Sequence, residues 1–110
     1  MKIISFGDIH EDTSNLIKIK PDLETADLIV LSGDLTNCHG KTETKKVLDA
    51  IKKYNKHLLA QYGNMDIQEA DSYLSEESIN LHGNGYIFGD VGVFGCGASS
   101  LTPFHTPSEI

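Results

Sequence analysis

The chain has 110 residues, 39% of them hydrophobic, which suits a single packed domain and argues against intrinsic disorder. Its formal net charge is −7, and an acidic surface repels phosphate backbones, so broad binding to nucleic acid or to an anionic membrane is not expected. The chain opens on an apolar run without a signal-peptide pattern, and Cys38 and Cys96 form no CxxC pair. These features predict a reduced, cytoplasmic protein whose two thiols are unpaired and lie in or near the core.

Strands and helices are expected to alternate through the first half of the chain. The apolar run Lys2–Phe6 predicts a strand, and a weak helix over Thr13–Lys20 is expected to end at Pro21. Asp27–Leu31 has the composition of a buried strand. An amphipathic helix over about Glu43–Tyr54 follows, because apolar residues recur there at helical spacing. Its apolar face comprises Val47, Leu48, Ile51 and Tyr54.

The second half begins in the same way and then changes character. His57–Gln61 predicts a third strand, and a helix is expected over about Asp66–Leu74. Beyond it, frequent glycines separate two short apolar runs, Tyr86–Phe88 and Val91–Phe94, which predict an antiparallel hairpin turning near Asp90. The sequence therefore predicts an α/β fold, in which a βαβαβα arrangement is followed by a β-hairpin.

A polar cluster follows each of the first three predicted strands. The clusters are Gly7-Asp8-Ile9-His10, Gly33-Asp34-Leu35-Thr36-Asn37 and Gly63-Asn64-Met65-Asp66. Because the carboxyl ends of adjacent parallel strands lie along one edge of a sheet, the three clusters are expected to meet in the crevice beyond that edge. The glycine that opens each cluster permits a tight turn and unusual backbone dihedral angles at the strand end.

The residue types in these clusters suit a divalent metal site. Residues two apart in extended backbone point the same way, so Asp8 and His10 can share one ion. The two oxygens of Asp34 could bridge a pair of ions, and Asn64 could supply an amide oxygen. Carboxylate, imidazole and amide ligands together favour manganese, iron or zinc over copper. Two such ions would outweigh the charge of the aspartates and could hold an anionic phosphoester.

In this order and spacing, the motifs Gly-Asp-Ile-His, Gly-Asp-Leu-Thr-Asn and Gly-Asn-Met-Asp resemble those of the calcineurin-like metallophosphoesterases. The resemblance covers essentially the whole chain but only the N-terminal half of the family's layered α/β/β/α sandwich. It implies two divalent ions, the first bound by Asp8 and His10, both bridged by Asp34, and the second bound by Asn64. It also implies hydrolysis of a phosphomonoester or phosphodiester by a metal-bound hydroxide, with no side chain as the nucleophile.

Met65 departs from the pattern of the family. The third motif of the family usually reads Gly-Asn-His-Asp, in which the histidine helps to protonate the leaving group and the aspartate orients it. Met65 occupies the position of that histidine, and a thioether cannot deliver a proton. We therefore expect no catalytic side chain here and a subfamily that lacks this acid. Asp66 is expected to cap the following helix instead, with Glu69 completing a capping box.

The later histidines of the family, including a Gly-His-x-His motif, have no counterpart, since neither His82 nor His105 lies in such a pattern. Thr106 and Glu109 have the spacing of a helix N-cap and its N3 residue, yet the chain ends directly afterwards. The sequence thus predicts the N-terminal portion of a metallophosphoesterase domain over residues 1–110, truncated and weakly active or inactive by itself. A non-catalytic metal-binding or interaction module is the alternative.

Other polar residues near the clusters are expected to serve the structure and not to bind metal. Thr36 and Asn37 suit a turn. His39, His57 and His82 belong to no ligand motif. The partner expected at the metal site is a small phosphoester substrate, as the resemblance to the phosphoesterases implies.

The predicted hairpin is also the expected contact surface between copies of the chain. A half-sandwich should leave apolar sheet surface and strand edges bare, and such surfaces seek a partner. Two copies could cover one another across a twofold axis, so a homo-oligomer is expected. The residues expected on or near that surface are Tyr86, Ile87, Phe88, Val91, Val93 and Phe94.

Overall fold

A computed structural model describes residues 1–110 and shows a mixed α/β fold. The predicted alternation of strands and helices, followed by a hairpin, is confirmed. In chain order the elements are β1 (Ile3–Phe6), the 3₁₀ helix η1 (Leu16–Ile19), α1 (Lys20–Thr25), β2 (Leu28–Leu31), α2 (Lys41–Lys52), β3 (Leu58–Ala60), α3 (Gln68–Glu76), β4 (Gly85–Phe88) and β5 (Val91–Phe94).

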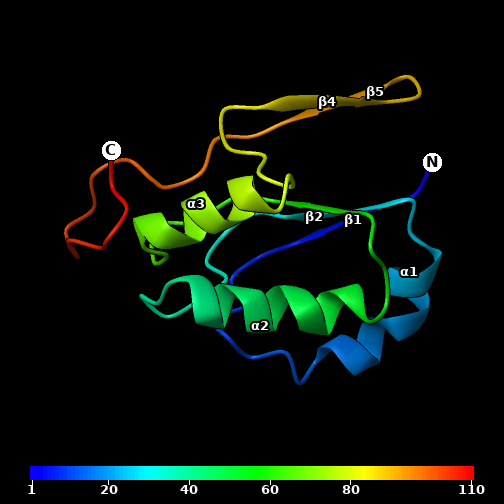
Figure 1. The fold of residues 1–110 in the computed structure, drawn as a ribbon, viewed down its shortest axis with the longest axis horizontal. Helices are drawn as coiled ribbons and strands as arrows, with labels where there is room; N and C mark the ends of the chain where they lie inside the picture. Colours follow the sequence, from blue (N-terminus) through cyan, green and yellow to red (C-terminus); the bar gives the residue numbers. More distant parts are fainter.

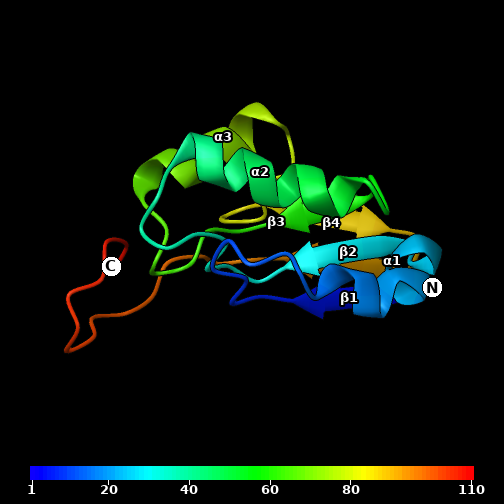
Figure 2. The same cartoon turned by 90° about the horizontal axis from the view of Figure 1, so that it is seen from below.

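Three parallel strands form the central sheet, in the order β1-β2-β3. Phe6 pairs with Leu31, and Leu31 pairs with Ala60, so the three strands end at the same level. Figure 2 shows the arrowheads of β1 and β2 pointing to the side of the molecule where the C-terminal segment lies. The loops that follow β1, β2 and β3 therefore lie together at one edge of the sheet.

The two faces of the sheet are covered by different elements. Helix α2 lies on one face, with α3 packed beside it, and the β4–β5 hairpin lies on the other (Figure 1). Successive strand residues point to opposite faces, so Ile29 and Leu31 join the helical core while Leu28 faces the hairpin. The fully buried side chains of the helical core include Leu23, Ile29, Leu31, Leu35, Leu48, Ile51 and Leu74.

The hairpin packs on the sheet through only one of its own faces. Tyr86, Phe88 and Val93 are half-buried against the small cluster of Leu28, Leu59 and Leu81. Val91 pairs with Phe88 and is also half-buried. Ile87 and Phe94 point the other way and are 82% and 85% exposed. Of the six apolar hairpin residues expected on or near bare surface, only Ile87 and Phe94 are exposed, because strand alternation turns the other four towards the sheet.

Two predicted helix boundaries are wrong. The segment expected to form a helix over Thr13–Lys20 contains only the 3₁₀ turn η1, and Pro21 lies in the first turn of α1. A proline is tolerated there because the first N–H groups of a helix have no intrahelical acceptor, so Pro21 begins a helix and does not end one. Helix α3 is preceded by Ile67 as its N-cap, without a side-chain cap, so Asp66 does not cap it.

The remaining expectations concern the C-terminal residues and the cysteines. Residues 99–110 form bends and turns without a helix, although Glu109 accepts the N–H of Thr106 as a capping box would require. Cys38 and Cys96 are unpaired, as expected, but both are exposed and so lie outside the core. None of the helices combines the length and the apolar character needed to cross a membrane.

Candidate metal centre

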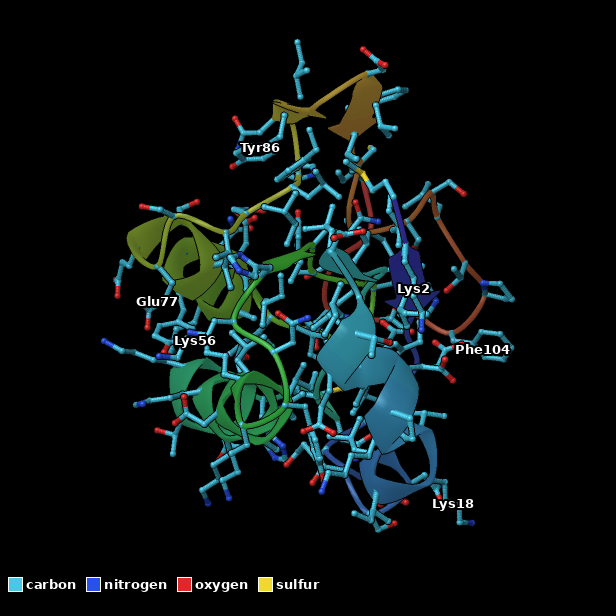
Figure 3. The ribbon with its side chains drawn as sticks, turned by 90° about the vertical axis from the view of Figure 1, so that its right-hand side faces the viewer. Lys2, Lys18, Lys56, Glu77, Tyr86 and Phe104 are labelled. Atoms are coloured by element: carbon cyan, nitrogen blue, oxygen red, sulfur yellow. The ribbon has the colours of Figure 1, made fainter.

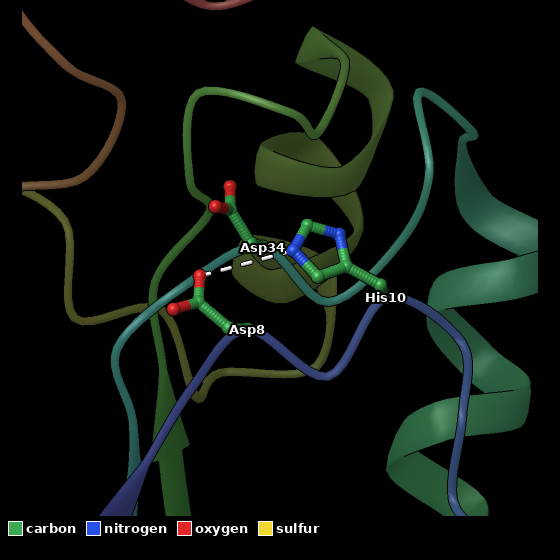
Figure 4. A group of neighbouring side chains, drawn as sticks. All are labelled: Asp8, His10 and Asp34. Carbon is green, nitrogen blue, oxygen red and sulfur yellow. Dashed lines mark ion pairs between the residues drawn. The ribbon is translucent and has the colours of Figure 1, made fainter.

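Three side chains from the first two polar clusters meet at the carboxyl edge of the sheet. One potential ligand atom from each of Asp8, His10 and Asp34 lies within 4.8 Å of the other two. The Nε2 atom of His10 lies 3.8 Å from Oδ1 of Asp8, and Figure 4 draws this contact as a dashed line, with the Asp34 carboxylate beside it. The structure thus brings together three of the four residues that the sequence places at a metal site.

The backbone at these residues differs from the expected extended form. Asp8, His10 and Asp34 have φ angles of 52°, 49° and 53°, in the left-handed region. That conformation costs a non-glycine residue about 1–2 kcal/mol. Hydrogen bonds between the first two loops hold it in place, since the N–H of Asp8 donates to the carbonyl of Gly33 (3.1 Å) and the N–H of His10 to the carbonyl of Asp34 (3.0 Å). The side chains converge through these turns and not through strand periodicity.

The glycines of the clusters mainly provide space. A Cβ on Gly63 would lie 2.1 Å from Oδ1 of Asp34, and one on Gly7 would lie 2.1 Å from Oγ of Ser32. Only Gly33 has the unusual dihedral expected of all three, with a φ of 121°, and a Cβ there would lie 2.8 Å from Cα of Gly63. The glycines therefore let the second and third loops approach closely enough to enclose the Asp34 carboxylate.

Asp34 is the electrostatic centre of the group. Burial raises the pKa of its carboxyl group, and the neighbouring carboxyl groups of Asp8 and Asp66 raise it further. The N–H of Met65, which donates to Oδ1 of Asp34 at 3.0 Å, and the nearby His10 act in the opposite direction. A cation between these carboxylates would favour their charged forms, so the site's own charges suit a bound divalent ion.

The donor set and its accessibility also fit a metal ion. Two carboxylates and an imidazole are ligands that borderline divalent ions accept. The side chains of Asp8 and His10 are 83% and 36% exposed, so an ion could enter from solvent. The one imperfect feature is Nδ1 of His10, which is buried and lacks the hydrogen-bond partner that usually fixes the ring of a metal-bound histidine.

Asn64, the fourth predicted ligand, lies in the third loop. Its neighbours Gly63 and Met65 both contact Asp34, which places Asn64 at the same edge of the sheet. The side-chain Nδ2 of Asn64 donates to Oγ1 of Thr106 at 3.0 Å. Its Oδ1 therefore is the atom through which this amide could bind an ion.

Asp66 has a role that sequence reasoning missed. Its carboxylate is fully buried and accepts N–H groups from Leu35 (3.2 Å), Thr36 (2.8 Å) and Gly63 (2.8 Å). The hydroxyl group of Thr36 donates to it as well, at 2.8 Å. Asp66 thus joins the second and third loops across 30 positions of sequence, and the capping-box pattern gave no signal of this. Thr36, expected to be a turn residue, is a buried donor in the same network.

A second polar contact joins the first and second loops. Glu11 accepts the N–H of Asn37 at 2.8 Å and lies 2.6 Å from Nδ1 of His39. The side chain of Asn37 donates to the carbonyl of His10 at 3.0 Å. This pairing lowers the pKa of Glu11 and raises that of His39, chiefly through the hydrogen bond between them. His39 is therefore engaged in holding the loops together.

These observations define the chain as an α/β protein with a candidate metal centre at the carboxyl edge of a parallel sheet. A family model described as calcineurin-like phosphoesterase matches residues 1–106. The chain belongs to this family, and the resemblance inferred from its motifs is confirmed. The parallel sheet, its helices and the hairpin agree with a partial calcineurin-like fold. No curated protein and no solved structure matches the chain.

The buried carboxylate of Asp66 should dominate the stability of the site. An Asp66→Asn substitution keeps the size of the side chain but turns an amide group towards N–H donors, so we expect a loss of about 2–4 kcal/mol in the free energy of unfolding. Asp90→Asn, at an exposed turn of the hairpin, should change it by less than about 0.5 kcal/mol. Urea unfolding of both variants measures the difference. Equal stabilities would contradict the role given to Asp66.

Proposed function

We propose that this chain provides ligands for two divalent ions of a phosphoesterase that hydrolyses phosphomonoesters or phosphodiesters. The observation that carries the proposal is the close group of Asp8, His10 and Asp34 at the sheet edge of a chain that belongs to the calcineurin-like phosphoesterases. Residues 1–110 would form the N-terminal portion of the catalytic domain. Manganese, iron and zinc are the candidate ions, because the donors are oxygen and imidazole nitrogen.

Each residue has a separate task in this proposal. Asp8 and His10 would hold the first ion, and Asp34 would bridge both ions through its two carboxylate oxygens. Asn64 would bind the second ion through Oδ1. The N–H of Met65 keeps Asp34 oriented by donating to one of its oxygens at 3.0 Å. When bound, the ions would supply positive charge for a phosphate and lower the pKa of a water molecule.

The charge of the chain supports a small phosphoester as the substrate. With a net charge of −7, the surface repels a large polyanion, whereas a phosphate at the ions would meet local positive charge. The exposed side chain of Asp8 leaves the site open to such a molecule. Met65 cannot protonate a leaving group, so reactions with stable leaving groups should be favoured.

A non-catalytic metal-binding module is the alternative. The observation that favours it is Met65, which stands where the family usually has an acid. A measurement of phosphoester hydrolysis distinguishes the phosphoesterase from the metal-binding module. Both are expected to bind metal, but only the phosphoesterase is expected to hydrolyse a substrate.

Metal affinity should depend on Asp34. Manganese titrated into the chain by calorimetry should bind, and Asp34→Asn should weaken binding about tenfold or more, because the bridging carboxylate loses its charge. Asp12→Asn provides a matched control, since Asp12 is an exposed carboxylate that accepts hydrogen bonds from Ser14. Equal affinities of the Asp34→Asn variant and the unsubstituted chain would contradict the assignment.

Leaving-group dependence should reveal the missing acid. Residues 1–110 should hydrolyse p-nitrophenyl phosphoesters slowly or not at all, and addition of the later part of a family domain should raise turnover. In that enzyme, Met65→His should accelerate hydrolysis of alkyl phosphoesters more than that of nitrophenyl esters, because only the former need a proton. Rates with both substrate classes measure this. If Met65→His changed the rates for alkyl and nitrophenyl esters to a similar extent, Met65 would not lie at the position of the acid.

We also propose that copies of the chain associate through the outer face of the hairpin. Ile87 and Phe94 lie on that face and are 82% and 85% exposed, which leaves apolar surface on the side of the hairpin that faces away from the sheet. A twofold arrangement would cover both copies with the same residues.

Light scattering at micromolar concentration should therefore report at least twice the monomer mass, and Phe94→Lys should lower it by placing a charge in the contact. Phe104→Lys is the matched control, since Phe104 is 81% exposed but lies outside the hairpin and points away from the body of the molecule (Figure 3). A monomer with a cooperative unfolding transition would refute the association.

A further inference from the structure

The C-terminal residues lie against the third metal-site loop. The N–H of Ala98 donates to the carbonyl of Tyr62 at 2.9 Å, and the N–H of Ser108 donates to the carbonyl of Asn64 at 3.0 Å. The hydroxyl group of Ser108 also donates to the carbonyl of Asp66. These contacts lie at both ends of the third cluster, so residues 98–110 pack against the third loop (orange to red in Figure 1).

Glu109 organises this segment. Its carboxylate accepts the N–H and hydroxyl groups of Thr102, at 2.9 and 2.7 Å, and the N–H and hydroxyl groups of Thr106. These donors lower the pKa of Glu109 to about 2, so the group stays charged and accepts hydrogen bonds throughout the physiological range. A charged carboxylate cannot donate, and this fixes the direction of every hydrogen bond that it makes.

The direction of these bonds determines how the Asn64 amide is turned. The single proton of the Thr106 hydroxyl group points to Glu109, so towards Asn64 the hydroxyl oxygen can offer only a lone pair. The atom of Asn64 that lies 3.0 Å from this oxygen must therefore be the donor Nδ2 and not the acceptor Oδ1. The Oδ1 atom is turned away from Thr106, with its lone pairs free to bind a cation.

We propose that Thr106, oriented by Glu109, is a positioning residue that holds the Asn64 amide with Oδ1 available to the second divalent ion. The proposal rests on the proposed function for Asn64 as a ligand, but the orientation of the amide exists without the ion. Without the hydroxyl group of Thr106, either end of the amide could face the ion, and the NH2 end would repel it. Sequence reasoning assigned Thr106 only to a helix start and gave it no part in the site.

Thr106→Val and Thr102→Val form a matched pair that tests this role. Both substitutions remove a threonine hydroxyl that donates to Glu109, but only Thr106 contacts Asn64. In the metal-free chain, NMR should show one side-chain NH2 proton of Asn64 shifted by its hydrogen bond and slow to exchange. Thr106→Val should abolish both the shift and the slow exchange of this proton, whereas Thr102→Val and Thr106→Ser should preserve them. An unchanged Asn64 signal in Thr106→Val would overturn the proposal.

Metal titration of the same variants completes the test. The affinity for the second manganese ion should fall about tenfold or more in Thr106→Val and stay close to the unsubstituted value in Thr102→Val. Equal losses in both variants would mean that the threonines only stabilise the segment, and would overturn the positioning role. If the unsubstituted chain holds the amide as described but binds no manganese, the proposed function fails while the hydrogen-bonded orientation stands.

Discussion

The carboxylate of Asp66 holds the second and third loops together from inside the protein, and the arrangement of the candidate metal centre depends on that contact. This carboxylate is fully buried and accepts hydrogen bonds from the N–H groups of Leu35, Thr36 and Gly63 and from the hydroxyl group of Thr36. A buried charge is stable only when donors surround it, so the two loops cannot separate without exposing or stranding this group. Because Gly63 lies in the same network, its backbone closes on Asp34 and helps to enclose the central carboxylate of the site.

The sheet supplies the position of the site, and the loops supply its geometry. Parallel pairing ends β1, β2 and β3 at one level, which places three chain turns side by side. Within those turns, Asp8, His10 and Asp34 adopt left-handed backbone conformations that hydrogen bonds between the loops maintain. Strained residues of this kind are kept only where surrounding contacts determine them, and here they direct three potential ligand groups to one point. Burial, and then the neighbouring carboxyl groups of Asp8 and Asp66, raise the pKa of Asp34 as a result of that convergence.

The fold was largely predictable because its signals are local. Buried strands, the amphipathic α2 and the glycine-flanked hairpin each follow from a short stretch of sequence, and the parallel sheet places the clusters at one edge. The failures have physical reasons. Pro21 is compatible with both the end of one helix and the start of another, and sequence alone does not choose between them. Asp66 matched a local capping pattern, but a buried network formed with residues 30 positions away proved stronger.

The same distinction applies to the candidate metal centre. The identities of Asp8, His10 and Asp34 could be predicted from the motifs, whereas their left-handed conformations could not, because these depend on contacts between loops. Glu11, which joins the first two loops, and Thr106, which contacts Asn64, belong to no metal-ligand motif, and these contacts became visible only in the folded chain.

The central claim is that residues from the three loops bind divalent ions at the carboxyl edge of the sheet. Crystals soaked in zinc and measured at the zinc absorption edge test it most directly. An anomalous peak within about 2.0–2.2 Å of oxygens of Asp8 and Asp34 and of Nε2 of His10 is predicted, with a second ion on Asn64 Oδ1. Zinc found only elsewhere, for example on His39, would contradict the account.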